Sequence, residues 1–140
     1  MNINWKPNYI IGDLVYNHKG EVIRITSSYL KGTRLFYYKT DEIGESIGNI
    51  LEEALKPIPL TPEILEKNGW YGTTHSKLSY DNTKILYKTF KRKGYPTIKV
   101  SQDLKITCEL SPFIVKLQSV SDLQHLLFGL SINHEMKVLV

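Results

Sequence analysis

The sequence predicts an α+β protein of mainly antiparallel β-strands, an SH3-like small barrel or a meander, with two short helices. Three observations support this fold class. Short runs rich in β-branched and aromatic residues alternate with polar positions, which is typical of half-buried antiparallel strands. Turn residues such as Asn-x-x-Gly separate several of these runs, as hairpins require. Two further segments combine a capping residue with the apolar spacing of a helix.

The first unit is expected to be a small β-barrel-like structure over residues 1–58. Residues 9–16 and 21–26 are predicted strands, because β-branched and aromatic residues flank a turn at 17–20. A third strand is predicted over 34–39, followed by an acidic loop with a short strand near 46–50. The Gly-Asp-Leu-Val run and the following Gly/Val/Ile pattern resemble the opening of KOW- and SH3-like small barrels.

Prolines and capping residues mark the passage into a second unit, residues 59–140, which we expect to pack with the first as one compact domain. The prolines within 57–62 favour extended chain and indicate a rigid crossing. A helix is predicted over 62–68, because Thr61 is a good N-cap and proline suits the first helical position. Gly69 supplies a left-handed stop.

The remainder of the chain reads as a β-meander with a helix packed on it. The predicted strands are 85–90, 97–101, 105–110 and 113–115, with a final strand over 135–140. A second helix is expected over about 121–131, starting after Ser121 with Gln124 at the capping-box position. Four leucines of this helix form one apolar stripe, and Phe128 lies off that stripe.

Composition narrows the class of protein. The chain has 140 residues, of which 41% are hydrophobic and 23% charged, and a chain of this length buries about two thirds of its unfolded surface. No apolar run approaches the ~18 residues of a membrane span, and no signal-peptide pattern opens the chain. Cys108 is the single cysteine, so no internal disulfide forms. We therefore expect a cytoplasmic protein without a membrane partner.

A second resemblance covers most of the chain. The segment Lys56–Thr61, the helix after it, Gly69–Trp70 and the later Leu123–Leu126 with Phe128 are similar to short uncharacterised proteins of Bacteroidetes and their phages. The resemblance implies a phage or mobile-element setting and the cytoplasm of a bacterial host. That group has no established catalytic residues, so the resemblance transfers no site residue.

Catalytic and metal motifs are missing from the sequence. The four histidines lie in no zinc-binding frame, and one cysteine cannot build a zinc site alone. There is no nucleophile elbow and no glycine-rich phosphate loop. Cys108 lies in a predicted strand, where a free cysteine usually serves as a small buried hydrophobe. We therefore expect a non-enzymatic protein with no catalytic residue, no metal and no cofactor.

A basic and aromatic hairpin is the main functional signal. Residues 77–116 hold nine basic and three acidic residues, and cations interleave with aromatic rings over 84–99. Cations for phosphates and rings for bases are what single-strand binding requires. A solvated hairpin with a lysine-rich edge is the plainer interpretation of the same residues. The candidate contacts for nucleic acid or another partner are Tyr87, Lys88, Lys91, Arg92, Lys93 and Tyr95.

An aromatic surface for a protein partner is the leading hypothesis for function. The chain has nine tyrosines, and adjacent Tyr37 and Tyr38 point to opposite faces of a strand. Tyr38 and the off-stripe Phe128 are the candidate interface residues. The hypothesis is an accessory binding protein of phage or mobile-element type, acting on a host or defence factor or on a second copy of itself. Nucleic-acid binding through 84–99 is the alternative, and a small catalytic or nucleotide-sequestering protein comes third.

Overall fold

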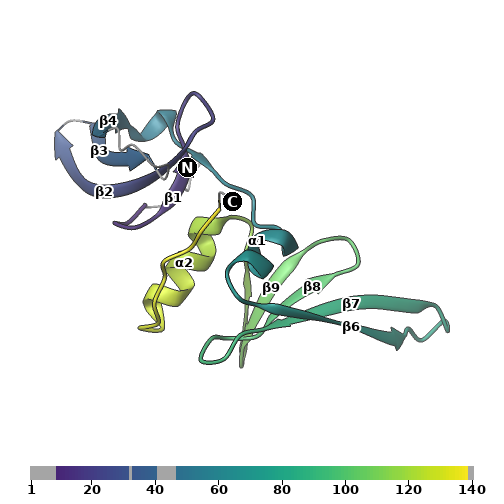
Figure 1. Ribbon diagram of the computed structural model, residues 1–140. Coiled ribbons are helices and arrows are strands. Elements are labelled where there is room, and N and C mark those ends of the chain that lie inside the picture. The colour runs from purple at the N-terminus through teal and green to yellow at the C-terminus, as the bar shows by residue number, and fades with distance from the viewer. Residues whose placement is uncertain (1–8, 32, 41–46, 139–140) are drawn as a thin grey trace. The chain divides into compact units, whose positions relative to one another are not determined.

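The computed structural model describes residues 9–31, 33–40 and 47–138 (Figure 1). The chain divides into two compact units, one up to Pro57 and one from Ile58. Each unit is built on its own five-stranded sheet, in which all neighbouring strands are antiparallel. Two short α-helices complete the described residues. The α+β class with mainly antiparallel sheets is therefore confirmed.

The first unit is an open sheet in the order β4-β3-β2-β1-β5. Its elements are β1 (Leu14–Tyr16), β2 (Val22–Lys31), β3 (Thr33–Thr40), β4 (Ile47–Leu51), the 3-10 turn η1 (Glu52–Ala54) and β5 (Lys56–Pro57). Within the described residues β4 and β5 remain the two edges, so the SH3-like barrel is not closed. β5 has only two residues, and Pro57 has no N–H with which to extend a ladder.

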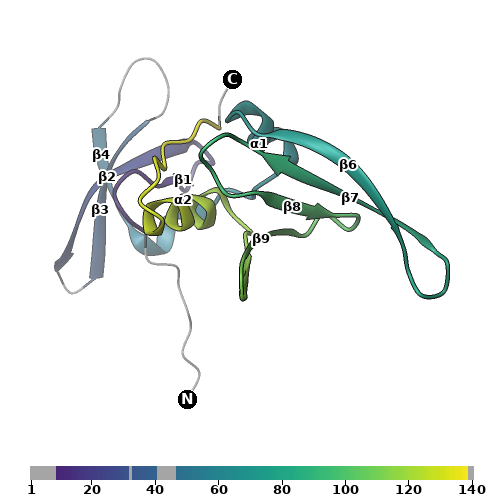
Figure 2. The same cartoon turned by 90° about the horizontal axis from the view of Figure 1, so that it is seen from below.

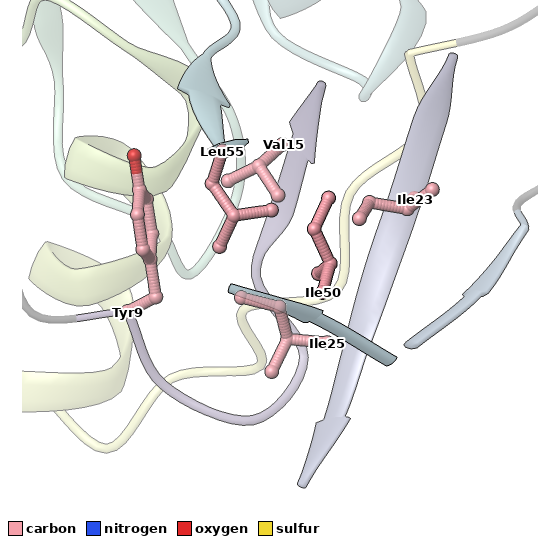
Figure 3. Close-up of a cluster of buried hydrophobic side chains, with 6 residues drawn as sticks. All are labelled: Tyr9, Val15, Ile23, Ile25, Ile50 and Leu55. Atoms are coloured by element: carbon pink, nitrogen blue, oxygen red, sulfur yellow. The ribbon is translucent and has the colours of Figure 1, made fainter. Parts of the chain in front are cut away.

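A small core lies on one face of this sheet. Figure 3 shows its six buried side chains: Tyr9, Val15, Ile23, Ile25, Ile50 and Leu55. The predicted turn between β1 and β2 is confirmed, because the side-chain oxygen of Asn17 accepts bonds from the N–H groups of Lys19 and Glu21, both at 2.9 Å. Gly20 takes the positive φ of +78° that this turn needs. The predicted strand from residue 9 begins only at Leu14.

The second unit is a meander in the order β10-β9-β8-β7-β6, so each strand pairs with its neighbour in sequence. Its strands are β6 (Tyr71–Leu78), β7 (Lys84–Lys91), β8 (Ile98–Ser101), β9 (Ile106–Leu110) and β10 (Phe113–Lys116). The predicted meander is confirmed in four of these strands, and β6 is an addition. β6 and β7 pair over eight residues each while β8 pairs with only the last part of β7, so the hairpin extends beyond the sheet (Figure 2).

The inner face of this second sheet forms the core of the unit. Phe90, Ile98 and Cys108 lie directly opposite one another on β7, β8 and β9, and all three are buried. Gly72 of β6 lies opposite Phe90, and a Cβ at Gly72 would come within 2.7 Å of the Phe90 ring. Because Gly72 has no side chain, the Phe90 ring can lie against the backbone of β6.

The helix α1 (Pro62–Lys67) confirms the first helix prediction to within one residue. The Thr61 hydroxyl accepts a bond from the N–H of Ile64 at 3.3 Å, as an N-cap should. At the other end Gly69 has a φ of +91°. Its N–H and that of Trp70 both donate at 3.1 Å to carbonyls of the last turn, which completes a Schellman motif.

The helix α2 (Val120–Gly129) confirms the second helix prediction but corrects its start. The N-cap is Ser119, and Asp122 completes the capping box by accepting from the Ser119 N–H at 3.0 Å. Ser121 and Gln124, the expected cap and box residues, are buried inside the helix. The sequence offers two serines two residues apart, and the ionised Asp122 carboxylate is the stronger partner for an N-terminal N–H.

The predicted C-terminal strand is wrong over the residues that the structure describes. Residues 135–138 belong to no strand, and 139–140 lie outside the described residues. The side chain of Asn68 pairs with this segment instead, accepting from the Lys137 N–H at 2.7 Å and donating to the Lys137 carbonyl at 2.8 Å. An amide side chain therefore satisfies backbone groups that a strand would otherwise pair.

Candidate nucleic-acid interface

The strand register of the second unit gathers cations and rings on the sheet face opposite its core. Alternate residues of a strand point to opposite faces, and directly paired residues point to the same face. His75 of β6 pairs with Tyr87 of β7, and Tyr71 pairs with Lys91. Lys99 of β8 pairs with Thr89, two residues from Tyr87. We define the outer face by six residues: Tyr71, His75, Lys77, Tyr87, Lys91 and Lys99.

Tyr87 is the centre of the outer face. Its half-buried ring stacks on the His75 ring, with centroids 5.2 Å apart and planes inclined by 22°. The ammonium groups of Lys99 and Lys77 lie 4.8 Å and 5.8 Å from the Tyr87 ring centroid. His75 is held in turn by a 2.8 Å hydrogen bond between its Nε2 and the Thr89 hydroxyl. Cation–π contacts therefore place two lysines beside an aromatic pair.

The segment from β6 to β8, which carries the outer-face residues, holds a single acidic residue. Asp81 is the single acid between residues 71 and 101, and it lies in the turn after β6. There its carboxylate accepts bonds from the Ser79 hydroxyl and from the Thr83 N–H. These side-chain bonds, that from Ser79 first, lower the pKa of Asp81 to about 2. The carboxylate is thus used in building the turn.

We expect the Asp81 turn to loosen only in strong acid. Because the pKa is lowered in the folded turn, the carboxylate contributes stability in full above its ordinary pKa of 3.8 and loses it as the pH falls through about 2. Carbon-detected NMR titration of the Asp81 carboxyl should give a midpoint near 2, and Ser79→Ala should raise it towards 3.8. A wild-type midpoint near 3.8 would show that the Asp81 carboxylate does not accept these hydrogen bonds in solution.

The structure separates the residues of the predicted basic hairpin. Tyr87 and Lys91 lie on the outer face, whereas Lys88 pairs with Val100 and points to the opposite side. Arg92 and Tyr95 lie in the loop between β7 and β8, where the guanidinium carbon is 3.9 Å from the Tyr95 ring centroid. The same carbon lies 5.1 Å from the Trp70 ring. Lys93 is exposed in that loop.

Four outer-face residues, Tyr71, His75, Lys77 and Lys99, were not among the predicted site residues. The first three belong to β6, a segment in which no strand was predicted. Its residues are polar and exposed, so it lacks the apolar alternation on which strand prediction depends. A period of two in larger side chains, Tyr71-x-Thr73-x-His75-x-Lys77, is the signal that could have indicated it.

The two residues predicted for a protein interface belong to different units. Tyr38 is half-buried against the core of the first sheet, and its hydroxyl would lie 2.8 Å from a Cβ at Gly48. That ring is therefore used in packing. Phe128 of α2 is 59% exposed. Its ring meets the His134 ring edge-on, with centroids 5.3 Å apart.

Cys108 is a core residue. It is buried on β9, and burial raises the pKa of its thiol, with the neighbouring Glu109 carboxylate adding to the effect. Because the thiolate is the reactive form, we expect iodoacetamide at pH 8 to label Cys108 much more slowly in the folded protein than in urea. Mass spectrometry of timed samples measures both rates. Equal rates would contradict a buried, protonated thiol.

The described residues hold neither a cluster of metal ligands nor a helix that could span a membrane. Among the described residues, no three His, Cys, Asp or Glu side chains come together as metal ligands would. None of the helices in this part of the chain has the length and apolar character needed to cross a membrane. Comparison with protein-family models, with curated proteins and with solved structures found no match to this chain.

Proposed function

We propose that the second unit binds single-stranded nucleic acid on the outer face of its sheet and carries out no catalysis. The observation that supports this proposal is the Tyr87 cluster. The Tyr87 ring stacks with His75, and the ammonium groups of Lys77 and Lys99 lie 5.8 Å and 4.8 Å from the Tyr87 ring centroid. Lys91 and the 80% exposed ring of Tyr71 continue the same face.

Each kind of side chain on the outer face has a role in this proposal. Lysines neutralise phosphates and release their counterions, which supplies affinity without regard to sequence. Exposed rings such as Tyr71 stack with bases, and this stacking contributes about 1–3 kcal/mol per base. The long lysine side chains over Tyr87 can swing from the ring to a phosphate, since an exposed cation–π contact contributes only about 0.5–1 kcal/mol.

The charge of the outer face favours nucleic acid over a protein partner. Lysine is depleted in the cores of protein interfaces, because burying its ammonium group against another protein is costly. Three of the six outer-face residues are lysines. A polyanion meets all three ammonium groups with phosphates that remain partly in water, so no buried, unpaired charge results.

A protein partner remains a second candidate function, supported by the exposed ring of Phe128. In a phage or mobile-element setting such a partner would be a host or defence factor. Phe128→Ala should then remove the partner from an affinity pull-down while leaving the melting temperature unchanged, because the ring contributes little to the core.

Salt dependence is the direct test of the proposed function. The fluorescence anisotropy of a labelled 15-nucleotide oligo(dT) should rise with protein at low salt. Three phosphate contacts predict a log–log slope of about −2 for a single strand, so affinity should fall about 20-fold between 50 and 200 mM salt. Absence of binding at 50 mM salt, or an affinity indifferent to salt, would contradict the proposal.

A further inference from the structure

A pocket of about 350 Å³ lies at the β10 edge of the second sheet, where the β9–β10 ladder ends. The chain there passes from β10 towards α2, and the Leu117 N–H donates to the Ile106 carbonyl at 2.9 Å. One residue later the Gln118 carbonyl accepts from the Leu60 N–H at 3.1 Å. The pocket lining consists of Leu60, Leu104, Lys105, Ile106, Thr107, Lys116, Leu117 and Gln118. None of these is an outer-face residue.

The lining combines an apolar floor with a cationic rim. Leu60, Ile106 and Leu117 are buried in the fold and offer hydrocarbon to the cavity. Lys105 and Lys116 are exposed at its rim. The volume falls within the range of pockets for small molecules, about 300–1,000 Å³. Floor and rim together suit a ligand with an apolar body and a charged end.

Leu104 forms an apolar wall of the pocket in an unusual backbone conformation. It has a φ of 64°, a region in which glycine or asparagine costs less than a leucine. Its side chain is 70% exposed. The tight turn between β8 and β9 holds this conformation, with the Leu104 N–H donating to the Ser101 carbonyl at 3.0 Å. Packing in the protein core does not account for a leucine here, but a wall for an apolar ligand does.

The positive charge of the residues at the pocket rim favours a ligand with negative charge. Two lysines and no carboxylate line the pocket. The Asp103 carboxylate lies 3.6 Å from the Lys105 ammonium group, but both side chains are largely exposed. An exposed pair of this kind contributes at most about 1 kcal/mol, so a ligand anion can compete with it.

We propose that this pocket binds a small amphipathic anion, with a short acyl chain or similar apolar body on Leu60, Leu104 and Leu117 and one carboxylate or phosphate at Lys105 and Lys116. This site shares no residue with the outer face and does not rest on nucleic-acid binding. Its occupant is a small molecule rather than a polymer, because the volume of the pocket is that of a small-molecule site.

Titration of the ¹⁵N-labelled full chain with sodium octanoate tests this proposal. Octanoate should shift the backbone amides of 104–107 and 116–118 in a saturable way. Inorganic phosphate, which has the charge but no apolar body, should not shift them at equal concentration. 1-Octanol, which has the body but no charge, should bind about fivefold more weakly than octanoate, because two exposed charge contacts contribute about 1 kcal/mol together.

Two variants separate the contributions of the rim and the wall. Lys105→Met with Lys116→Met should weaken octanoate binding about fivefold and leave 1-octanol binding unchanged. Leu104→Asn should weaken both ligands, and it keeps the fold because asparagine tolerates the positive φ. Equal affinities for octanoate and 1-octanol, shifts that centre on other residues, or full octanoate affinity in the double-lysine variant would each overturn the proposal.

Discussion

Trp70→Ala is expected to lower the free energy of unfolding by about 3–5 kcal/mol, the cost of emptying a buried aromatic site. The Trp70 side chain is 1% exposed. Its indole N–H donates to the Pro96 carbonyl at 3.4 Å, and the Tyr95 ring meets it edge-on with centroids 5.1 Å apart. A domain of this size has about 5–15 kcal/mol of stability in total, so the loss is a large share.

The position of Trp70 in the chain explains why the loss should be large. Its N–H closes the Schellman motif at the end of α1, and the next residue begins β6. Its ring also supports the loop between β7 and β8, where Arg92 lies against it. One side chain thus joins a helix end, a strand start and a loop.

Urea unfolding followed by circular dichroism measures this effect. The matched control is Tyr71→Ala, which removes the neighbouring aromatic side chain at an exposed position and should change stability by no more than about 0.5 kcal/mol. The loss of stability in Arg92→Met should lie between the losses in Trp70→Ala and Tyr71→Ala, because this variant keeps the aliphatic stem and loses the cation over Trp70 and Tyr95. Unfolding midpoints that coincide for Trp70→Ala and wild type would contradict this account of the core.

The sequence predicted elements well where local chemistry decides them. Thr61, Pro62 and Gly69 act within a few residues of α1, and the structure confirms all three. The turn at Asn17 and Gly20 is equally local. The start of α2 was misplaced because both Ser119 and Ser121 can serve as the N-cap. The hydrogen bond between the Ser119 N–H and the Asp122 carboxylate shows that Ser119 is the N-cap.

Predictions failed where partners distant in sequence decide the structure. The segment 135–138 is held by Asn68, nearly 70 residues away, rather than by a neighbouring strand. β6 forms because it pairs with β7 along its length, although its own residues are polar. Closure of the first sheet would need pairing between β4 and β5, which the sequence cannot report.

The predicted contact residues and the outer-face residues are of the same types, basic and aromatic, but only some of them are the same residues. The predicted contact residues include Tyr87 and Lys91, which lie on one face of the sheet. They also include Arg92 and Tyr95, which pack with Trp70 inside the unit. Adjacent residues of a strand point to opposite faces, so residues that are clustered in the sequence lie on two different faces of the sheet. His75 and Lys77 reach the outer face from another strand, β6.

Charge reversal on the outer face is expected to remove nucleic-acid binding. The variant Lys77→Glu, Lys91→Glu and Lys99→Glu exchanges the three lysines of the outer face for anions. Affinity for single strands should fall at least about 100-fold, because three contacts are lost and three repulsions are added. Folding should be retained, since these side chains lie on the face away from the core.

The decisive measurement compares this variant with a control of identical charge. Lys84→Glu, Lys88→Glu and Lys93→Glu makes the same change in net charge at exposed lysines outside the outer face. In oligo(dT) anisotropy at 50 mM salt, the control should lose no more than about fivefold in affinity, because it changes only the long-range electrostatic attraction between protein and oligo(dT). The outer-face variant should lose at least about 100-fold. Equal losses in the two variants would contradict the assignment of the nucleic-acid site to the outer face.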